Sequence, residues 1–371
     1  MRNLTNILVT GGCGFIGSNF IRFLLNSPEF TGRIINLDKL TYAGNPQSLI
    51  DIEKQFGGTR YFFEHADITD AVDVNRIFET YNIDTVVHFA AESHVDRSIT
   101  GPAEFIKTNI QGTFILLEAA RKHWIENNTQ RDTNTENRQN IRNNFLFHHV
   151  STDEVYGSLG DEGYFSEQTP YDPRSPYSAS KASSDHLVRS YYHTYGLPIT
   201  ISNCSNNYGP YQFPEKLIPL MIENMFEEKP LPVYGDGANI RDWLYVEDHN
   251  SAVWMVMQKG ETGTSYNIGG ENEWRNIELV QRLCEITAEE TGKTPDHYKK
   301  LITFVNDRPG HDRRYAIDCS KIKTELGWKQ SVTFDQGLRR TIRWYLENRS
   351  WVQNVKSGEY LAWIEKNYKE R

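Results

Sequence analysis

Short apolar runs recur through the first two hundred residues, and segments with helical spacing of apolar residues lie between them. After the first run, for example, Phe20, Ile21, Leu24 and Leu25 fall on one face of a helix. Strands alternating with helices predict an α/β fold with a doubly wound parallel sheet of Rossmann type. The runs are hydrophobic almost throughout, which is typical of strands covered on both faces. They occupy residues 6–10, 34–37, 61–63, 85–89, 145–150 and 199–201.

Two parts of the chain depart from this pattern. Residues 126–144 carry Asn, Thr, Arg and Glu with almost no apolar residue, which predicts a solvated surface insertion. Past about residue 205 the chain is richer in Pro, Gly and Trp, and its periodic segments are shorter. We therefore expect a first domain over residues 1–205 and a smaller mixed α/β lobe over residues 206–371, with some segments of the second part returning to the first domain.

A glycine turn lies between the first predicted strand and the first helix. Gly11, Gly14 and Gly17 form a three-glycine fingerprint whose first gap is one residue wider than in G-x-G-x-x-G. Such glycines allow a tight turn and leave a diphosphate at the positive end of the helix. Asp38 ends the next apolar run, where a carboxylate accepts ribose hydroxyls and repels a 2′-phosphate. The pattern predicts a dinucleotide site that prefers NAD to NADP, and an ordinary turn is the alternative.

Composition narrows the choice of partners. The 371 residues carry a formal net charge of −9 and offer no basic face to nucleic acid or to an anionic membrane. No stretch approaches the roughly 18 apolar residues of a membrane span. The N-terminus has no signal-peptide pattern, so we expect a soluble cytoplasmic protein. The cysteines are scattered without metal-ligand spacing, which predicts buried thiols, no disulfide and no metal site; they are Cys13, Cys204, Cys284 and Cys319.

Proton-transfer groups gather between residues 151 and 181. Thr152, Asp153 and Glu154 follow the strand that ends near Val150, at the carboxyl end where open α/β sheets bind ligands. Two carboxylates with separated pKa values make an acid and a base. Simple redox chemistry does not need so many proton-transfer groups, so the two carboxylates indicate an elimination. An acidic pair that is merely solvated, or that caps the next turn, is the alternative.

A second group of this kind lies on the next predicted helix. Ser175 and Pro176 are typical of a helix start and place Tyr177 and Lys181 four residues apart on one face. Because an ammonium beside a phenol favours the phenolate, we expect a lowered pKa for Tyr177 and a base for a substrate hydroxyl. An ordinary surface pair is the alternative.

Five segments together resemble the extended short-chain dehydrogenase/reductase family. The Thr-Asp-Glu triplet is similar to the branch that dehydrates nucleotide sugars, whereas the sugar epimerases usually carry a serine and smaller neighbours there. The resemblance runs from about residue 5 to about residue 350. Its segments are residues 10–17 (TGGCGFIG), 90–97 (AAESHVDR), 151–157 (STDEVYG), 175–181 (SPYSASK) and 203–209 (NCSNNYG).

The resemblance implies a 4,6-dehydratase that holds NAD tightly and uses it internally. Tyr177 would remove the C4 hydroxyl proton of the sugar while hydride passes to NAD, and the resulting ketone acidifies the C5 hydrogen. Glu154 would abstract that hydrogen while Asp153 protonates the departing C6 hydroxyl. Return of hydride to C6 and of a proton to C5 would give a 4-keto-6-deoxy sugar nucleotide with no net redox.

The resemblance also implies a wider set of contacts. Asp67 and Ile68 would meet the adenine, while Arg241 and Arg308 would clamp the substrate diphosphate; core packing and surface salt bridges are the respective alternatives. The implied cofactor contacts are Gly11, Gly14, Phe15, Ile16, Gly17, Asp38, Lys39, Asp67, Ile68, Ala90, Ala91, Thr108, Tyr177, Lys181 and Asn206. The implied substrate contacts are Ser93, Thr152, Asn207, Lys216, Leu217, Pro232, Tyr234, Arg241 and Arg308.

Other functions stay open at this point. A nucleotide-sugar 4-epimerase or decarboxylase on the same scaffold would have no use for Asp153 and Glu154. A non-catalytic NAD-binding sensor would have no use for any of the proton-transfer groups. The resemblance alone implies a homodimer whose four-helix interface is formed by the helices that follow the fourth strand and that carry Tyr177. The sequence does not fix the base of the nucleotide.

Overall fold

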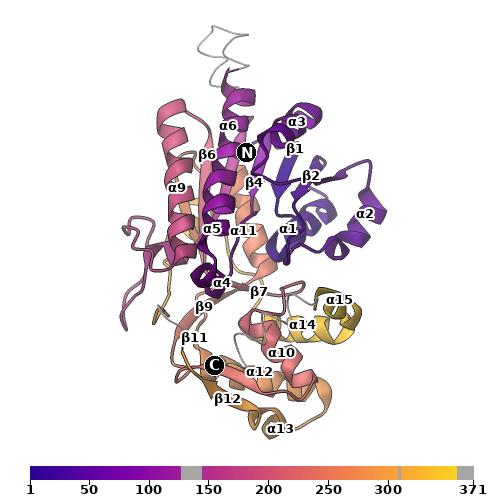
Figure 1. Cartoon of the computed structure of the whole chain (residues 1–371), viewed down its shortest axis with the longest axis vertical. Coiled ribbons are helices and arrows are strands. Elements are labelled where there is room, and N and C mark those ends of the chain that lie inside the picture. Colours follow the sequence, from indigo (N-terminus) through magenta and orange to yellow (C-terminus); the bar gives the residue numbers. More distant parts are fainter. Residues whose placement is uncertain (127–143, 308–310, 357–371) are drawn as a thin grey trace.

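The computed structural model describes residues 1–126, 144–307 and 311–356, and it shows two lobes stacked along the long axis of the molecule (Figure 1). The larger lobe is built on a seven-stranded sheet in the order β10-β6-β5-β4-β1-β2-β3. All of its strand pairs are parallel. The strands are β1 (Asn6–Thr10), β2 (Arg33–Asp38), β3 (Tyr61–His65), β4 (Thr85–His88), β5 (Leu146–Thr152), β6 (Ile199–Cys204) and β10 (Ser265–Ile268).

Helices cover both faces of this sheet. In β1, Ile7 and Val9 join a core cluster with α1 (Phe15–Asn26) and α11 (Val246–Lys259), while Leu8 joins a cluster on the other face. That second cluster includes α3 (Ala71–Tyr81), α6 (Thr113–Ala120) and α9 (Pro176–Tyr195). Burial on both faces explains why the strands read as apolar runs rather than as alternating ones. The short segments between them are η1 (Pro46–Leu49), α2 (Ile50–Phe56), α4 (Val95–Thr100), α5 (Pro102–Phe105), η2 (Ile106–Gly112), η3 (Arg121–Glu126) and η4 (Asp153–Tyr156).

The predicted doubly wound parallel sheet is confirmed, with two differences in detail. β5 runs on to Thr152 instead of ending near Val150, so Thr152 is the last residue of the strand. The seventh strand, β10, has no counterpart among the predicted runs. β10, α11 and η5 (Ile322–Leu326) lie past residue 205 and pack in the larger lobe. The expected polar insertion at 126–144 lies, except for its two end residues, outside the described residues.

The smaller lobe has its own hydrophobic core and contains two small sheets. One sheet has the order β11-β9-β7, and the other pairs β12 with β8. A third hydrophobic cluster joins these strands to the helices of the lobe. Its elements are β7 (Asn206–Tyr208), α10 (Leu217–Phe226), β8 (Leu231–Tyr234), β9 (Ile240–Tyr245), β11 (Glu273–Arg275), α12 (Asn276–Thr291), α13 (Pro295–Lys299), β12 (Ile302–Val305), α14 (Phe334–Glu347) and α15 (Arg349–Val355).

The strand order fixes where a ligand site can form. The chain leaves β1 toward β2 and β3 on one side, and the later strands β4, β5 and β6 lie on the other. Such a reversal opens a crevice at the carboxyl ends of the strands. None of the described helices is long and apolar enough to cross a membrane. The four cysteines are buried free thiols, as expected.

Candidate active site

A cavity at the carboxyl ends of the central strands is lined by residues from both lobes. It contains each of the five expected catalytic residues and each of the fifteen expected cofactor contacts. Their positions follow the strand order: Gly11 comes after β1, Asp38 ends β2, Asp67 follows β3, Ala90 follows β4 and Thr152 ends β5. Residues far apart in the sequence meet because their strands are parallel and end at one edge.

The glycine turn after β1 has no room for side chains at two of its three fingerprint positions. Gly11 has a φ of +70°, and a Cβ there would lie 2.7 Å from the backbone of Ala90. A Cβ on Gly17 would lie 2.3 Å from the carbonyl oxygen of Gly11. A Cβ on Gly14 would meet one atom, at 3.3 Å, because Gly14 lines the cavity. Helix α1 begins at the next residue without an acidic side chain in its first turn, which suits an anionic ligand.

Asp38 holds the two loops that border the nucleotide end of the cavity. Its Oδ2 accepts from the Cys13 amide and its Oδ1 from the Leu40 amide, both at 2.8 Å. Burial raises the pKa of Asp38, and the two amide donors oppose that shift. A carboxylate has about four acceptor sites, so acceptor capacity is left for ribose hydroxyls. Beside it, Lys39 pairs with Asp67 at 2.8 Å between Nζ and Oδ2.

Asp153 and Glu154 lie side by side at the start of η4, and Asp153 is 1% exposed. Burial, together with Glu154 and Asp242, raises the pKa of Asp153 well above its usual range. The Thr152 hydroxyl donates to Asp153 Oδ1 at 3.3 Å, and within the described chain Asp153 Oδ2 has no hydrogen-bond donor facing it. Burial therefore favours the neutral acid form of Asp153, and its Oδ2 atom keeps unused hydrogen-bonding capacity at the cavity wall.

The Thr152 side chain, and not the acidic pair, caps the turn that follows β5. Its Oγ1 accepts from the Glu154 amide at 3.3 Å. The capping alternative for the two carboxylates is thus unnecessary, because the turn already has its cap. Both carboxylate residues line the cavity.

Helix α9 begins at Pro176, as the sequence predicts, with Ser175 as its N-cap in a capping box. It places Tyr177 and Lys181 in the cavity wall, both buried. The expected lowered pKa of Tyr177 is wrong for the chain by itself. Burial raises that pKa well above its usual range, and Glu154 adds to the effect. The pair is buried, and the Lys181 ammonium donates to the Val150 carbonyl oxygen at 2.9 Å.

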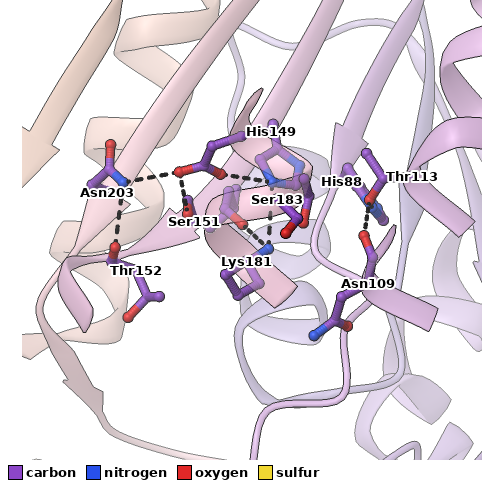
Figure 2. A network of polar contacts seen from close by, with 12 residues as sticks. His88, Asn109, Thr113, His149, Ser151, Thr152, Lys181, Ser183 and Asn203 are labelled. Atoms are coloured by element: carbon purple, nitrogen blue, oxygen red, sulfur yellow. Dashed lines mark hydrogen bonds and ion pairs between the residues drawn. The ribbon is translucent and has the colours of Figure 1, made fainter. Parts of the chain in front are cut away.

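Figure 2 shows that the wall behind Lys181 is polar and belongs to several elements. His149 of β5 lies 3.4 Å from the Lys181 ammonium through its Nε2 atom. Asn203 of β6 donates to the Thr152 carbonyl oxygen at 3.3 Å, which ties the end of β5 to its neighbour. In β4, His88 Nε2 lies 2.9 Å from the Thr113 hydroxyl. Lys181 therefore packs against a buried polar layer and not against an apolar core.

The expected substrate contacts divide into two groups. Ser93, Asn207 and Lys216 line the cavity together with Thr152, and the Lys216 ammonium donates to the Ser93 carbonyl oxygen at 3.2 Å. The other described members, Leu217, Pro232, Tyr234 and Arg241, are not among its lining residues. Arg308 lies outside the described residues.

Arg241 is buried close to the acidic pair. Its guanidinium stacks over the Tyr315 ring at 4.3 Å and donates to the Asp312 carbonyl oxygen at 2.9 Å. Its charge lowers the pKa of Asp153 in part, against the larger effect of burial. Tyr234 donates to Asp96 Oδ2 at 3.2 Å across the two lobes.

The sequence predictions missed a cluster at the border of the lobes. Arg97 lies over the Tyr42 ring at 3.7 Å and pairs with Glu215 at 3.2 Å, and both Tyr42 and Glu215 line the cavity. Tyr42 lies in the loop after β2, and Glu92, which also lines the cavity, lies in the loop after β4. Their position in the sequence, just after a predicted parallel strand, is the signal that could have identified Tyr42 and Glu92 as site residues. Among the described residues, no group of His, Cys, Asp or Glu is placed to hold a metal ion.

Comparisons with known proteins agree with this geometry. The chain matches the family described as GDP-mannose 4,6 dehydratase over residues 8–341. It is 56% identical to the dTDP-glucose 4,6-dehydratase of Salmonella typhimurium, with 98% of this chain and 99% of the relative covered. The crystal structure of dTDP-glucose 4,6-dehydratase from Bacillus anthracis in complex with NAD is similar with a TM-score of 0.81 and 45% identity, covering 95% of this chain and all of that one.

The fold by itself extends to other sugar-nucleotide enzymes. The UDP-glucose 4-epimerase of Thermotoga maritima reaches a TM-score of 0.79 at 29% identity, over 93% of this chain and all of that one. Shared architecture therefore leaves the reaction to be decided by the side chains in the cavity.

Proposed function

Because the chain belongs to the GDP-mannose 4,6 dehydratase family, in its dTDP-glucose 4,6-dehydratase branch, we propose that it converts dTDP-glucose to dTDP-4-keto-6-deoxyglucose and water. The observation that carries this proposal is the position of the buried Asp153 beside Glu154, in the same cavity as Tyr177, where burial raises the pKa of Asp153. A 4-epimerase has no leaving hydroxyl to protonate. An acid of this kind is therefore useful to a dehydratase and superfluous to an epimerase.

The cavity fits NAD at its nucleotide end. Gly11 and Gly17 leave no room for a side chain, and the glycine turn leads into the start of α1, where a diphosphate is favoured. Asp38 supplies carboxylate oxygens for the ribose and opposes a 2′-phosphate. When bound, NAD would accept the hydride from C4 of the sugar and later return it to C6. The oxidised cofactor would also place a positive charge near Tyr177, the residue that accepts the hydroxyl proton.

Tyr177, Thr152 and Lys181 serve the oxidation at C4. The Tyr177 phenolate would accept the hydroxyl proton and become the phenol, and the Thr152 hydroxyl would orient the same substrate oxygen. The high pKa of Tyr177 in the chain by itself is set by burial and by Glu154. Positive charge from Lys181 and the cofactor would lower it, because an opposite charge favours the ionised form.

Asp153 and Glu154 serve the elimination. Once C4 is a ketone, the Glu154 carboxylate removes the acidified C5 proton, and the neutral Asp153 gives its proton to the C6 hydroxyl, which leaves as water. Glu154 then returns a proton to C5. Each positioned acid or base is worth about 10²- to 10⁴-fold in rate.

Substrate is held from the smaller lobe. Asn207 and Lys216 reach the cavity, and Arg241 lies behind the acidic pair. We assign the substrate diphosphate to Arg241 and Arg308, because guanidinium forks suit phosphate oxygens. Leu217, Pro232 and Tyr234 would take the nucleoside from the outer part of the same lobe.

A homodimer and a cytoplasmic location complete the proposal. Three large apolar side chains are exposed on the stretch from α4 to α6: Ile99 is 39% exposed, Ile106 is 51% exposed and Phe114 is 45% exposed. Such side chains gain stability when a partner covers them. The helices α6 and α9 that border them are those expected at the four-helix interface.

The test is incubation of purified protein with dTDP-glucose and no added reductant, followed by mass spectrometry and proton NMR of the sugar nucleotide. Loss of one water and a new C6 methyl doublet would support the proposal. A product of unchanged mass with inverted C4 would identify an epimerase, and unaltered substrate despite bound NAD would favour another sugar nucleotide or the sensor function.

A further inference from the structure

A buried carboxylate lies behind the catalytic lysine and outside the cavity lining. Asp185 is one helical turn beyond Lys181 on α9 and is 0% exposed. Its Oδ2 accepts from the Ser151 hydroxyl at 2.9 Å and from the Tyr171 hydroxyl at 2.8 Å. Its Oδ1 lies 3.2 Å from His149 Nε2. Asp185 cannot touch substrate from this position, so any role in the reaction must act through another residue.

His149 lies between this carboxylate and the lysine. Its Nε2 atom is 3.4 Å from the Lys181 ammonium and 3.2 Å from Asp185 Oδ1. Burial and the Lys181 charge lower the pKa of His149 to about 4, so the imidazole is neutral at neutral pH. Burial opposes ionisation of Asp185, yet the contacts from His149, Lys181 and Ser151 hold its pKa below the usual range. The Lys181 ammonium, the neutral His149 ring and the Asp185 carboxylate therefore lie in a buried row, in that order.

We propose that Asp185, acting across neutral His149, is the counter-charge that keeps the Lys181 ammonium ionised and so sets the basicity of Tyr177. Burial lowers the pKa of Lys181, and Asp185 raises it again. Without the carboxylate, the ammonium would lose its proton more easily, and Tyr177 would lose the positive charge that favours its phenolate. Asp185 is thus a positioning residue, and this inference rests on the proposed function.

The other groups around Lys181 do not supply a charge of this kind. Cys204 faces it from β6, and burial raises the pKa of that thiol to about 12. His88 faces it from β4, and burial lowers the pKa of that imidazole well below its usual range. Both are neutral at neutral pH, so neither replaces Asp185 as the partner of the ammonium.

Apart from Lys181, the described groups around Asp185 are neutral with one exception, Arg189. Burial raises the pKa of Tyr171 and of Tyr156, so both phenols keep their protons. Arg189 of the same helix is a cation near the carboxylate, and its guanidinium donates to the Ser265 hydroxyl at 2.8 Å and to Tyr171 at 3.3 Å. The Arg189 charge therefore helps to keep Asp185 ionised, while its guanidinium donates to Ser265 and Tyr171.

A purely structural role is the alternative, because the same carboxylate ties α9 to β5 and to the loop that holds Tyr171. Asp185→Asn separates the two roles: the amide oxygen still accepts from Ser151 and Tyr171, but the charge is gone. We expect the acid limb of the kcat/KM profile for dTDP-glucose to move to higher pH by roughly one unit, with activity recovering between the shifted limb and the alkaline limb that Asp153 sets. NAD content should stay as in the wild type. An activity lost equally at every pH, or a limb that does not move, would overturn the proposal.

Two further variants keep the test decisive. Tyr171→Phe removes one donor to Asp185 and so weakens the preference of this carboxyl for its charged form, which should move the limb in the same direction by less. If Asp185→Asn does not fold, an unmoved limb in folded Tyr171→Phe protein overturns the proposal. Thr113→Val removes the contact with His88 in the same buried layer (Figure 2) and should lower the melting temperature without moving the limb. A limb moved by Thr113→Val as far as by Asp185→Asn would also overturn it. Wild-type protein that forms no keto sugar would instead contradict the proposed function.

Discussion

Gly17 packs against the carbonyl oxygen of Gly11, so a Cβ on Gly17 would lie 2.3 Å from that oxygen and 2.8 Å from the Gly12 Cα. The obstacles are backbone atoms, which cannot swing aside as a flexible side chain would. We expect Gly17→Ala to distort the turn, to cost about 1–3 kcal/mol of stability and to remove most bound NAD. Thermal unfolding and the cofactor content of the purified protein measure the two effects.

Gly160→Ala is the matched control for this change. Gly160 has open space where a Cβ would stand and does not have a positive φ. We expect unchanged NAD content and a stability within about 0.5 kcal/mol of the wild type. Retention of NAD by Gly17→Ala protein would contradict the proposed role of the turn.

Asp153 and Glu154 are adjacent, yet their replacement should interrupt the same step in different ways. We expect Asp153→Asn and Glu154→Gln each to slow dehydration by about 10²- to 10⁴-fold, because each removes one proton-transfer group from the elimination. Glu154→Gln should in addition slow the exchange of the C5 hydrogen with deuterated solvent, while Asp153→Asn should leave that exchange faster than product formation. Mass spectrometry of the recovered sugar nucleotide distinguishes the two. Equal loss of C5 exchange in both variants would contradict the separate roles.

The raised pKa of Asp153 predicts the alkaline side of the pH profile. Burial, Glu154 and Asp242 raise the pKa of this carboxyl well above its usual range, and only the protonated form can donate to the C6 hydroxyl. Activity should therefore be present below the folded-state pKa of Asp153 and fall as pH rises through it. The measurement is kcat against pH in the wild type and in Asp153→Asn, whose residual activity should not show this alkaline limb.

The larger lobe could be predicted from the sequence because its strands are unbroken apolar runs. The exception is β10, whose Ser265 to Ile268 segment alternates polar and apolar residues over four positions. Its place in the sheet comes from pairing with β6, across about 60 residues of chain, which no local pattern reports. Register and long-range pairing are tertiary properties.

The candidate site was predictable where function depends on backbone and residue type, as at Gly11, Asp38 and Thr152. The charge state of Tyr177 was not, because an i, i+4 spacing says nothing about burial or about where the Lys181 ammonium points. For the same reason, the contact between His149 and Asp185 could not be predicted from the sequence. They come from a strand and a helix 36 positions apart, and their contact exists only once β5 and α9 pack together.

Phe114 tests the proposed dimer. It is 45% exposed on α6, one of the helices expected at the interface. Phe114→Lys places a charge on that face, and burial of an unpaired charge is costly, so we expect a shift from dimer to monomer. Light scattering after size-exclusion chromatography measures the mass. Lys107→Glu, a polar change in the neighbouring segment, serves as a control for surface charge, and a mass of one chain in the wild type would contradict the dimer.

Glu223 joins the last described helix to the smaller lobe. Its side chain is 1% exposed on α10 and pairs with Arg349 at the start of α15 and with Lys356 just after it, the latter at 2.7 Å. On its other side, α15 contacts the larger lobe through the Trp351 indole, which donates to the Ser48 hydroxyl at 3.1 Å. Replacement by Gln removes the charge that holds both cations. We expect Glu223→Gln to cost roughly 2–3 kcal/mol, since hydrogen bonds to charged groups are worth more than neutral ones and the cations are half-buried.

The loss should be local to α15. Hydrogen exchange at residues 349–355 should become faster in Glu223→Gln, while exchange in β1 and β4 at the centre of the large sheet stays slow. Lys229→Ala is the control, because its pair with Glu227 is solvent-exposed, with 61% and 32% of the two side chains accessible, and should be worth no more than about 1 kcal/mol. Unchanged exchange in α15, or equal destabilisation by Lys229→Ala, would show that the Glu223 pairs do not hold this helix in place.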